Sequence, residues 1–331
     1  DKIDNFYEWN VEQGGPILRN KLWFFGAFRR AKYDRPIANT YYTPENVPFP
    51  VGFRACQQPG ADCEQGISDE KMNNPVIRLT WQASERNKFA AYMDRALRLR
   101  GHAMGSLTDP RTASVIWNTP TFATGSIKYT STLSSKLLLE TGFSFNRERY
   151  DNLYQPGVLA ERGTDAWYRN VRKNDTSTQL LWNASGAQLG NYPDRYNFQG
   201  ALSYVTGAHN VKVGASYQYG PYWRYNNANA DLYQTYNNGA PTQVTVLNTP
   251  LTVQEDLDAN FGIYAQDSWN LSRLTVNYGL RFDLNKQTIH GQNAMQGRFA
   301  NVPAYSDISF PTWKDFSPRL SVIYDIKGDV E

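Results

Sequence analysis

The feature that most constrains this chain is a difference between the two ends of its predicted strands. Stretches in which apolar and polar residues alternate with a period of two are typical of β-strands that have one apolar face. The clearest pair of such stretches spans 261–269 and 274–284, with a short turn at 270–273 between them. In the second stretch every other residue from Leu274 to Leu284 is apolar. This pattern predicts a β-hairpin with a short turn.

The same unit recurs along the chain. The other predicted short turns lie at 16–21, 84–87, 134–135, 207–210 and 327–329. Much longer segments join one hairpin to the next: 34–73, 101–120, 151–194, 221–257 and 287–312. Ordinary hairpin loops have about 2–5 residues. Because all the long segments fall at the same end, the pattern is that of an antiparallel transmembrane β-barrel of the outer membrane, an all-β fold.

Composition agrees with a barrel and argues against other classes. The mean hydropathy is −0.61, and no apolar run approaches the roughly 20 residues of a membrane helix. A barrel strand exposes only alternate residues to lipid, so it gives a weak hydropathy signal. The net charge of +3 and the lack of a basic stripe give no case for a nucleic-acid partner.

The strand count predicts a barrel larger than this chain can close. We count about eleven strands, whereas bacterial barrels normally have an even number. An open sheet edge in lipid leaves backbone groups unpaired, which costs several kcal/mol for each group. We therefore expect residues 1–331 to be part of a larger barrel.

The aromatic residues suggest where the membrane surface lies. Trp23, Trp81 and Trp269 all lie near short turns, which predicts an interfacial aromatic girdle. The alternative is that they are ordinary core residues. Two charged residues, Arg95 and Asp267, fall on the apolar face, each near a strand end, where a charge costs little.

Two cysteines, Cys56 and Cys63, lie close together in a long segment. This spacing predicts a local disulfide formed in an oxidising compartment. Two unrelated free thiols are the alternative. A metal site is not expected, because no histidine or further cysteine is near.

Signals for catalysis and for cofactors are poor. The three histidines, His102, His209 and His290, have no metal-ligand spacing, and no nucleotide-binding or hydrolase motif is present. We therefore predict no enzymatic activity, cofactor or metal.

A ligand site is suggested by aromatic and amide residues near one long segment. The candidates are Tyr222, Trp223, Tyr225 and Asn227. Such side chains suit a sugar, a peptide or a siderophore-like solute. The alternative is that these aromatics only pack the loop and form the outer girdle.

Three stretches resemble the barrel of TonB-dependent outer-membrane transporters, particularly the Oar-like group. They are GGPI at 14–17 with NKLWFFGAF at 20–28, YAQDSW at 264–269 with LTVNYGLRFD at 274–283, and Trp313 with FSPRL at 316–320. The resemblance implies a 22-stranded barrel, closed by an N-terminal plug domain and driven by the TonB–ExbB–ExbD complex. The plug and the TonB box are expected outside this sequence. The matched stretches mark strand ends and turns and carry over no substrate-contacting residue.

The preferred function is an active transporter of the bacterial outer membrane that takes up a large, scarce solute of unknown identity. Its partners would be outer-membrane lipid, the protein's own plug and the TonB complex. The alternatives are a passive porin or surface adhesin on the same barrel, and a soluble all-β carbohydrate-binding domain.

Overall fold

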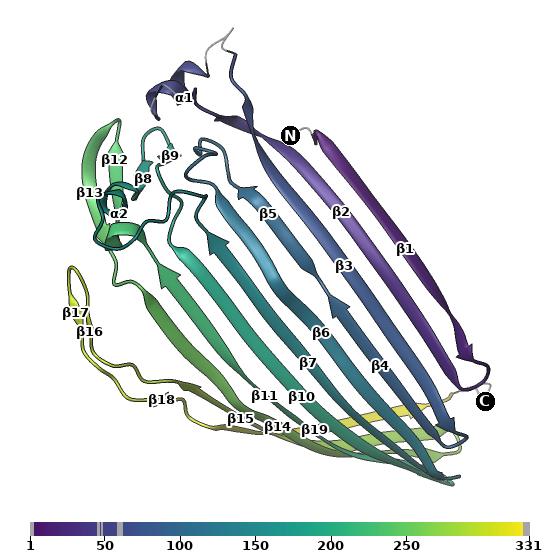
Figure 1. The fold of residues 1–331 in the computed structure, drawn as a ribbon. Helices are drawn as coiled ribbons and strands as arrows, with labels where there is room; N and C mark the ends of the chain where they lie inside the picture. Colours follow the sequence, from purple (N-terminus) through teal and green to yellow (C-terminus); the bar gives the residue numbers. More distant parts are fainter. Residues whose placement is uncertain (1–2, 45–46, 48, 58–61, 327–331) are drawn as a thin grey trace.

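The computed structural model describes residues 3–44, 47, 49–57 and 62–326, and most of them belong to one large sheet. Its long uninterrupted strands are β1 (Asn5–Leu18), β2 (Leu22–Tyr41), β3 (Gln65–Ser84), β6 (Val115–Ser134), β7 (Leu137–Leu153), β10 (Gln188–Thr206), β11 (His209–Asn227), β14 (Leu251–Leu271) and β15 (Leu274–Ile289). The sheet order follows the chain order from β1 to β15, and these neighbours pair antiparallel. Figure 1 shows this succession of tilted hairpins.

Two passes across the sheet are made of two strands each. The first consists of β4 (Asn87–Arg95) and β5 (Leu97–Ala103), which both lie between β3 and β6. The second consists of β18 (Ile308–Ser309) and β19 (Trp313–Tyr324), which both pair with β15. The thirteen strands of this sheet in the described residues therefore make eleven passes, which confirms the predicted count.

The predicted turn asymmetry is also present. Short turns join β1 to β2, β3 to β4, β6 to β7, β10 to β11 and β14 to β15 at one end of the sheet, and the long connections lie at the other. The turn predicted at 327–329 lies outside the described residues.

The register of the ladder assigns residues to the two faces of the sheet. Residues paired across antiparallel strands lie on the same face, and successive residues of one strand lie on opposite faces. One row across five strands is apolar: Leu139, Leu202, Val213, Ala265 and Leu280. The adjacent row, on the other face, carries the polar groups: Glu140, Ala201, Gly214, Tyr264 and Arg281.

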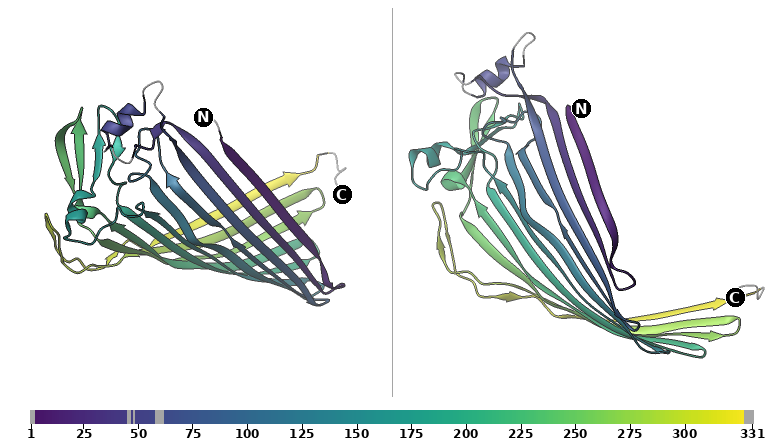
Figure 2. Two further views of the ribbon diagram at one scale, coloured as in Figure 1. Left: turned by 45° about the horizontal axis from the view of Figure 1, so that its top comes forward. Right: turned by 45° about the vertical axis from the view of Figure 1, so that its right-hand side comes forward.

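The polar face is the inner one. Glu140 on β7 accepts hydrogen bonds from Lys128 on β6 at 2.7 Å and from Lys212 on β11 at 3.4 Å. The second contact crosses the intervening strand β10, because side chains converge on the concave side of a curved sheet. Figure 2 shows this curvature from two further directions. The polar face thus lines the lumen, and the apolar face meets lipid.

The strands are longer at the long-loop end than the sequence predicted. The ladder continues through Tyr41, Leu153 and Asn227, so the connections shrink to 42–64, 104–114, 154–187, 228–250 and 290–312. The predicted loop boundaries were wrong because polar residues occupy both faces of these extensions. Backbone pairing persists there, but the apolar alternation that reveals a strand does not.

The three predicted girdle tryptophans do not share one face. Trp81 pairs with Phe89, which pairs with Tyr129, and these rings stack on the apolar face at 5.4 and 4.7 Å between centroids. Trp269 lies on the same face, in register with His209. Trp23 pairs instead with Thr80, in the row that contains Lys128, and so faces the lumen. The girdle stays a prediction for Trp81 and Trp269, and Trp23 does not belong to it.

Asp267 lies on the apolar face, and neighbouring side chains form hydrogen bonds with its carboxylate. Its carboxylate accepts a hydrogen bond from Tyr278 Oη at 2.8 Å and contacts His209 Nδ1 at 2.6 Å. The His209 ring in turn stacks on Trp269, with 5.4 Å between centroids. This cluster makes a carboxylate at the membrane surface tolerable.

The long loops fold into a compact structure of their own, called the loop cap here and consisting of segments 154–187 and 228–250. It contains a second sheet, in the order β13 (Ala240–Val246), β12 (Leu232–Asn237), β8 (Arg172–Asp175) and β9 (Leu181–Trp182). Strands β8 and β12 are parallel although they come from different loops. The short helix α2 (Asp165–Arg169) and the turn η1 (Asn229–Asp231) complete it.

The clusters of buried apolar side chains in the described residues lie in these loops and not in the membrane part of the sheet. One cluster contains Phe53, Leu180 and Trp182, a second Tyr154, Val158 and Ala184, and a third Trp167, Val171 and Ala230. Burial raises the pKa of Tyr154. The loop cap therefore has an apolar interior of its own.

Buried polar groups hold the loop cap together. Asp231 is fully buried, forms an ion pair with Arg162 and accepts a hydrogen bond from Thr249 Oγ1 at 2.6 Å. The side-chain amide of Asn229 donates to the carbonyls of Val158 and Asn170 at 2.7 and 2.8 Å. These contacts join segment 154–187 to segment 228–250.

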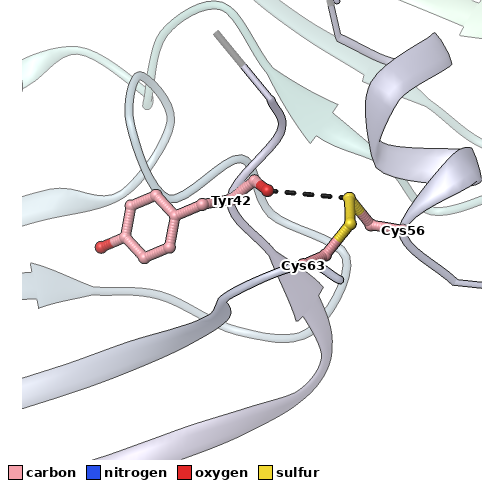
Figure 3. Close-up of a disulfide and its surroundings, with 3 residues drawn as sticks. All are labelled: Tyr42, Cys56 and Cys63. Carbon is pink, nitrogen blue, oxygen red and sulfur yellow. Dashed lines mark hydrogen bonds between the residues drawn. A yellow bond between two sulfur atoms is a disulfide. The ribbon is translucent and has the colours of Figure 1, made fainter. Parts of the chain in front are cut away.

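The predicted disulfide is present (Figure 3). Cys56 and Cys63 are bonded, and Cys56 Sγ lies 3.7 Å from the carbonyl oxygen of Tyr42. Helix α1 (Val51–Ala55) immediately precedes Cys56 and places Phe53 in the first buried cluster. Phe53 thus joins helix α1 to the loop cap, and the disulfide links the end of this helix to Cys63, two residues before β3. No helix among the described residues is long and apolar enough to cross a membrane.

The assignment of faces predicts different effects at two adjacent residues of β10. Leu202→Arg places a charge in lipid and should lower the free energy of unfolding by about 2–4 kcal/mol. Ala201→Arg, at the same depth, places it in the wet lumen beside Glu140 and should be mild. Denaturant unfolding from lipid vesicles measures both, and equal losses would show that the faces are wrongly assigned.

Removing the disulfide should destabilise only the loop that contains it. Cys56→Ser/Cys63→Ser should destabilise segment 42–64 by about 2–3 kcal/mol, because the closed loop is short. Protease added to whole cells should cut this segment faster, while the amount of folded barrel stays the same. Equal thiol labelling of the native and the reduced protein would contradict the assignment.

His290 predicts a pH dependence of the last described loop. Its Nε2 lies 2.8 Å from Asp256 and its Nδ1 3.6 Å from Asp307, and the hydrogen bond to Asp256 raises the pKa of His290 above its usual value. The stabilisation is therefore complete below the unfolded pKa of about 6.5 and is lost as pH rises through the folded pKa. Hydrogen exchange in 290–312, corrected for intrinsic rates, should accelerate between pH 5.5 and 8.5, and His290→Gln should abolish this change.

Candidate functional site

The candidate site lies on the lumen face just below the loop cap. The ladders between β7 and β10 and between β10 and β11 run without a register shift. The alternation that places Glu140 in the lumen therefore continues up these strands to Tyr150, Asn191, Tyr222 and Arg224. These residues are neighbours, because Asn191 pairs with both Tyr150 and Arg224.

One half of the site is built on β10, β11 and β14. The Tyr222 hydroxyl donates a hydrogen bond to Asn191 Oδ1 at 2.7 Å. The Arg224 guanidinium lies 5.8 Å from the centre of the Tyr222 ring and forms an ion pair with Glu255. Tyr222 is thus held from two sides.

The other half is built on β5, β6 and β7. The Trp117 ring lies 5.9 Å from that of Tyr150, and the Arg98 guanidinium lies 5.2 Å from Trp117. Arg98 is held by Glu70 on β3. Together these two halves form the lumen band, defined as Arg98, Trp117, Tyr150, Asn191, Tyr222 and Arg224.

Two amides directly above the lumen band have free acceptor capacity. Asn152 and Asn226 both pair with Leu189, one on each side of β10. Their buried Oδ1 atoms accept no hydrogen bond from any described residue. Aromatic faces with amides, carboxylates and guanidinium groups around them can hold a solute by stacking and by hydrogen bonds.

The structure separates the four predicted ligand residues. Tyr222 faces the lumen. Trp223 is the next residue of the same strand and faces outward, together with Tyr225 and Asn227. The four candidates cannot share one face, because segment 222–227 is strand and not loop.

Sequence reasoning missed Arg98, Trp117, Tyr150, Asn191 and Arg224. Trp117 and Asn191 fell inside segments assigned to loops, so no face was given to them. The signal was present in the alternation: continuing the period of two from the apolar Leu202 and Val213 puts Asn191 and Tyr222 on the opposite, polar face.

The histidines are not isolated as the sequence suggested. His102 Nδ1 lies 2.9 Å from Asp69, and His209 and His290 each contact an aspartate. His290 also lies 3.6 Å from a second aspartate, Asp307. The described residues contain no group of three or more histidine, cysteine, aspartate or glutamate side chains placed to hold a metal.

An antiparallel sheet with an apolar outer face, a polar lumen, short turns at one end and long loops at the other defines an outer-membrane β-barrel protein. A family model described as "Outer membrane beta barrel domain" matches residues 57–330, and the chain belongs to this family. The predicted fold class and the outer-membrane location are thereby confirmed. Membership of the Oar-like group stays a prediction. No curated protein sequence matches the chain.

Solved structures with the same fold include an outer membrane transporter and two receptors. The outer membrane transporter YddB from Escherichia coli is 14% identical, with a TM-score of 0.59 over 98% of this chain and 36% of that one. The ferric yersiniabactin uptake receptor FyuA from Yersinia pestis is 10% identical, with a TM-score of 0.58 over 98% and 43%. The ferric preacinetobactin receptor BauA from Acinetobacter baumannii is 12% identical, with a TM-score of 0.58 over 98% and 44%. The chain spans less than half the length of each.

Proposed function

We propose that this chain is the barrel part of a TonB-dependent outer-membrane transporter that takes up a large, scarce solute. The observation that carries the proposal is the lumen band, which places aromatic and charged side chains directly beneath the loop cap. A solute captured by the loops would meet these side chains next. Family membership and the likeness to an outer membrane transporter, a ferric yersiniabactin uptake receptor and a ferric preacinetobactin receptor support this direction.

The rest of the transport apparatus follows from the same proposal. A plug domain would fill the lumen, and a TonB box would connect it to the TonB–ExbB–ExbD complex. The complete barrel would have 22 strands, with the eleven passes described above as half of its wall. The chemistry of the lumen band suits a solute with both a flat or apolar face and several polar groups.

Solute depletion tests the transport mode. Spent medium from the wild type, from a strain lacking this protein and from a strain lacking TonB would be compared by mass spectrometry. An active transporter predicts a solute that is depleted only by the wild type. Depletion that needs the barrel but not TonB would indicate a passive porin instead.

The lumen band predicts a difference between adjacent residues of β11. With the depleted solute as probe, Tyr222→Ala should reduce uptake at low concentration several-fold, because a well-placed aromatic contact contributes about 0.5–1.5 kcal/mol. Trp117→Ala should act in the same direction. Trp223→Ala is the matched control, since it removes a larger ring from the opposite face.

Each variant must reach the outer membrane in normal amounts for the comparison to count. Equal uptake by Tyr222→Ala and Trp223→Ala would remove the lumen band from the transport path. A loss of uptake in Trp223→Ala alone would mean that the solute contacts the outer face of β11 and not the lumen face.

A further inference from the structure

The short-turn end of the sheet carries a repeated arrangement of cations. In five hairpins the residue immediately before the returning strand accepts a backbone hydrogen bond at 2.7–2.9 Å from the strand that follows the hairpin, or, in the last hairpin, from Asp325 directly after β19. Four of these five equivalent positions are basic: Lys21, Arg86, Lys136 and Arg273, with Ala208 at the fifth. The hydrogen bonds fix these residues at one level along the rim.

These four basic residues are called the rim cations here. All four are exposed, and none forms an ion pair with any described residue. Many charges at the opposite end are paired instead, as in Arg149 with Asp194, Arg162 with Asp231 and Arg224 with Glu255. Two carboxylates also lie at this end, Glu85 beside Arg86 and Asp325 beside Arg273, so four cations against two anions still leave the rim positive.

The level of the rim cations matches a membrane surface. Trp81 and Trp269 lie on the lipid face, five and four residues from Arg86 and Arg273. Tryptophan marks the headgroup layer, and long basic side chains reach phosphates just beyond it. Adjacent hairpins are two strands apart, or roughly 10 Å, so that each cation can meet a different lipid.

We propose that the rim cations bind the phosphate groups of anionic phospholipids in the inner leaflet of the outer membrane. Each flexible side chain offers an unpaired charge at the height where these phosphates lie. Lys136 also borders the lower lumen, so a soluble anion at the mouth of the barrel is the source that the test must separate from lipid.

The test uses the full-length protein reconstituted in bilayers of equal parts phosphatidylglycerol and phosphatidylcholine. The barrel is extracted with its surrounding lipid into polymer nanodiscs, and the ratio of the two lipids is measured by mass spectrometry. We expect phosphatidylglycerol to be enriched at low salt and less so at high salt. Each neutralised cation should lower the affinity for its headgroup about fivefold.

Two variants make the test decisive. The combined Lys21→Gln, Arg86→Gln, Lys136→Gln and Arg273→Gln variant should return the ratio to that of the bulk bilayer. Ala208→Lys adds a cation at the one neutral position and should increase the enrichment. Arg86→Lys/Arg273→Lys keeps the charge and should change nothing, and heat-dependent gel migration confirms that every variant is folded.

Three results would overturn the proposal. One is a wild-type lipid ratio equal to that of the bulk. Another is an unchanged enrichment in the combined glutamine variant or in Ala208→Lys. The third is binding of inorganic phosphate to the lipid-free protein that depends on the same four residues while the lipid ratio does not, which would assign the rim to a soluble anion.

Discussion

Backbone pairing is the constraint on which the rest of this structure depends. In lipid no water can satisfy an unpaired amide or carbonyl group, so each strand must bond along its length to its neighbours. The ladder then dictates side-chain direction. Once Leu202 faces lipid, Ala201 must face the lumen, and the partners of both residues on β7 and β11 follow. The polar lumen and the apolar belt are two consequences of one set of hydrogen bonds.

Sequence alone was informative where one face touches lipid, because the apolar alternation there is obligatory. The eleven passes, the short turns and the Cys56–Cys63 pair could be predicted for this reason and from local spacing. The alternation fades above the membrane, so Trp223 was placed in a loop and Trp117 was given no role. Trp23 was assigned to the lipid face because its position near a turn was considered and its register was not.

The candidate site illustrates the same limit. Arg98, Trp117 and Tyr150 come from three strands. They are in contact only because the strand register places them at the same level along the barrel. Sequence spacing does not contain that information until the register is known. The loop cap is harder still, since the parallel pairing of β8 with β12 joins segments about sixty residues apart through buried groups such as Asp231.

The loop cap also determines what the surroundings of the cell can recognise. Neighbouring loops pack on its two segments: Phe53 of helix α1 lies in one of the buried clusters, and Arg298 of segment 290–312 stacks on Tyr168. A bacteriophage or an antibody that binds there would contact a discontinuous epitope. Linear peptides copied from any single loop would lack the neighbours that give that loop its shape, and would make poor mimics or immunogens.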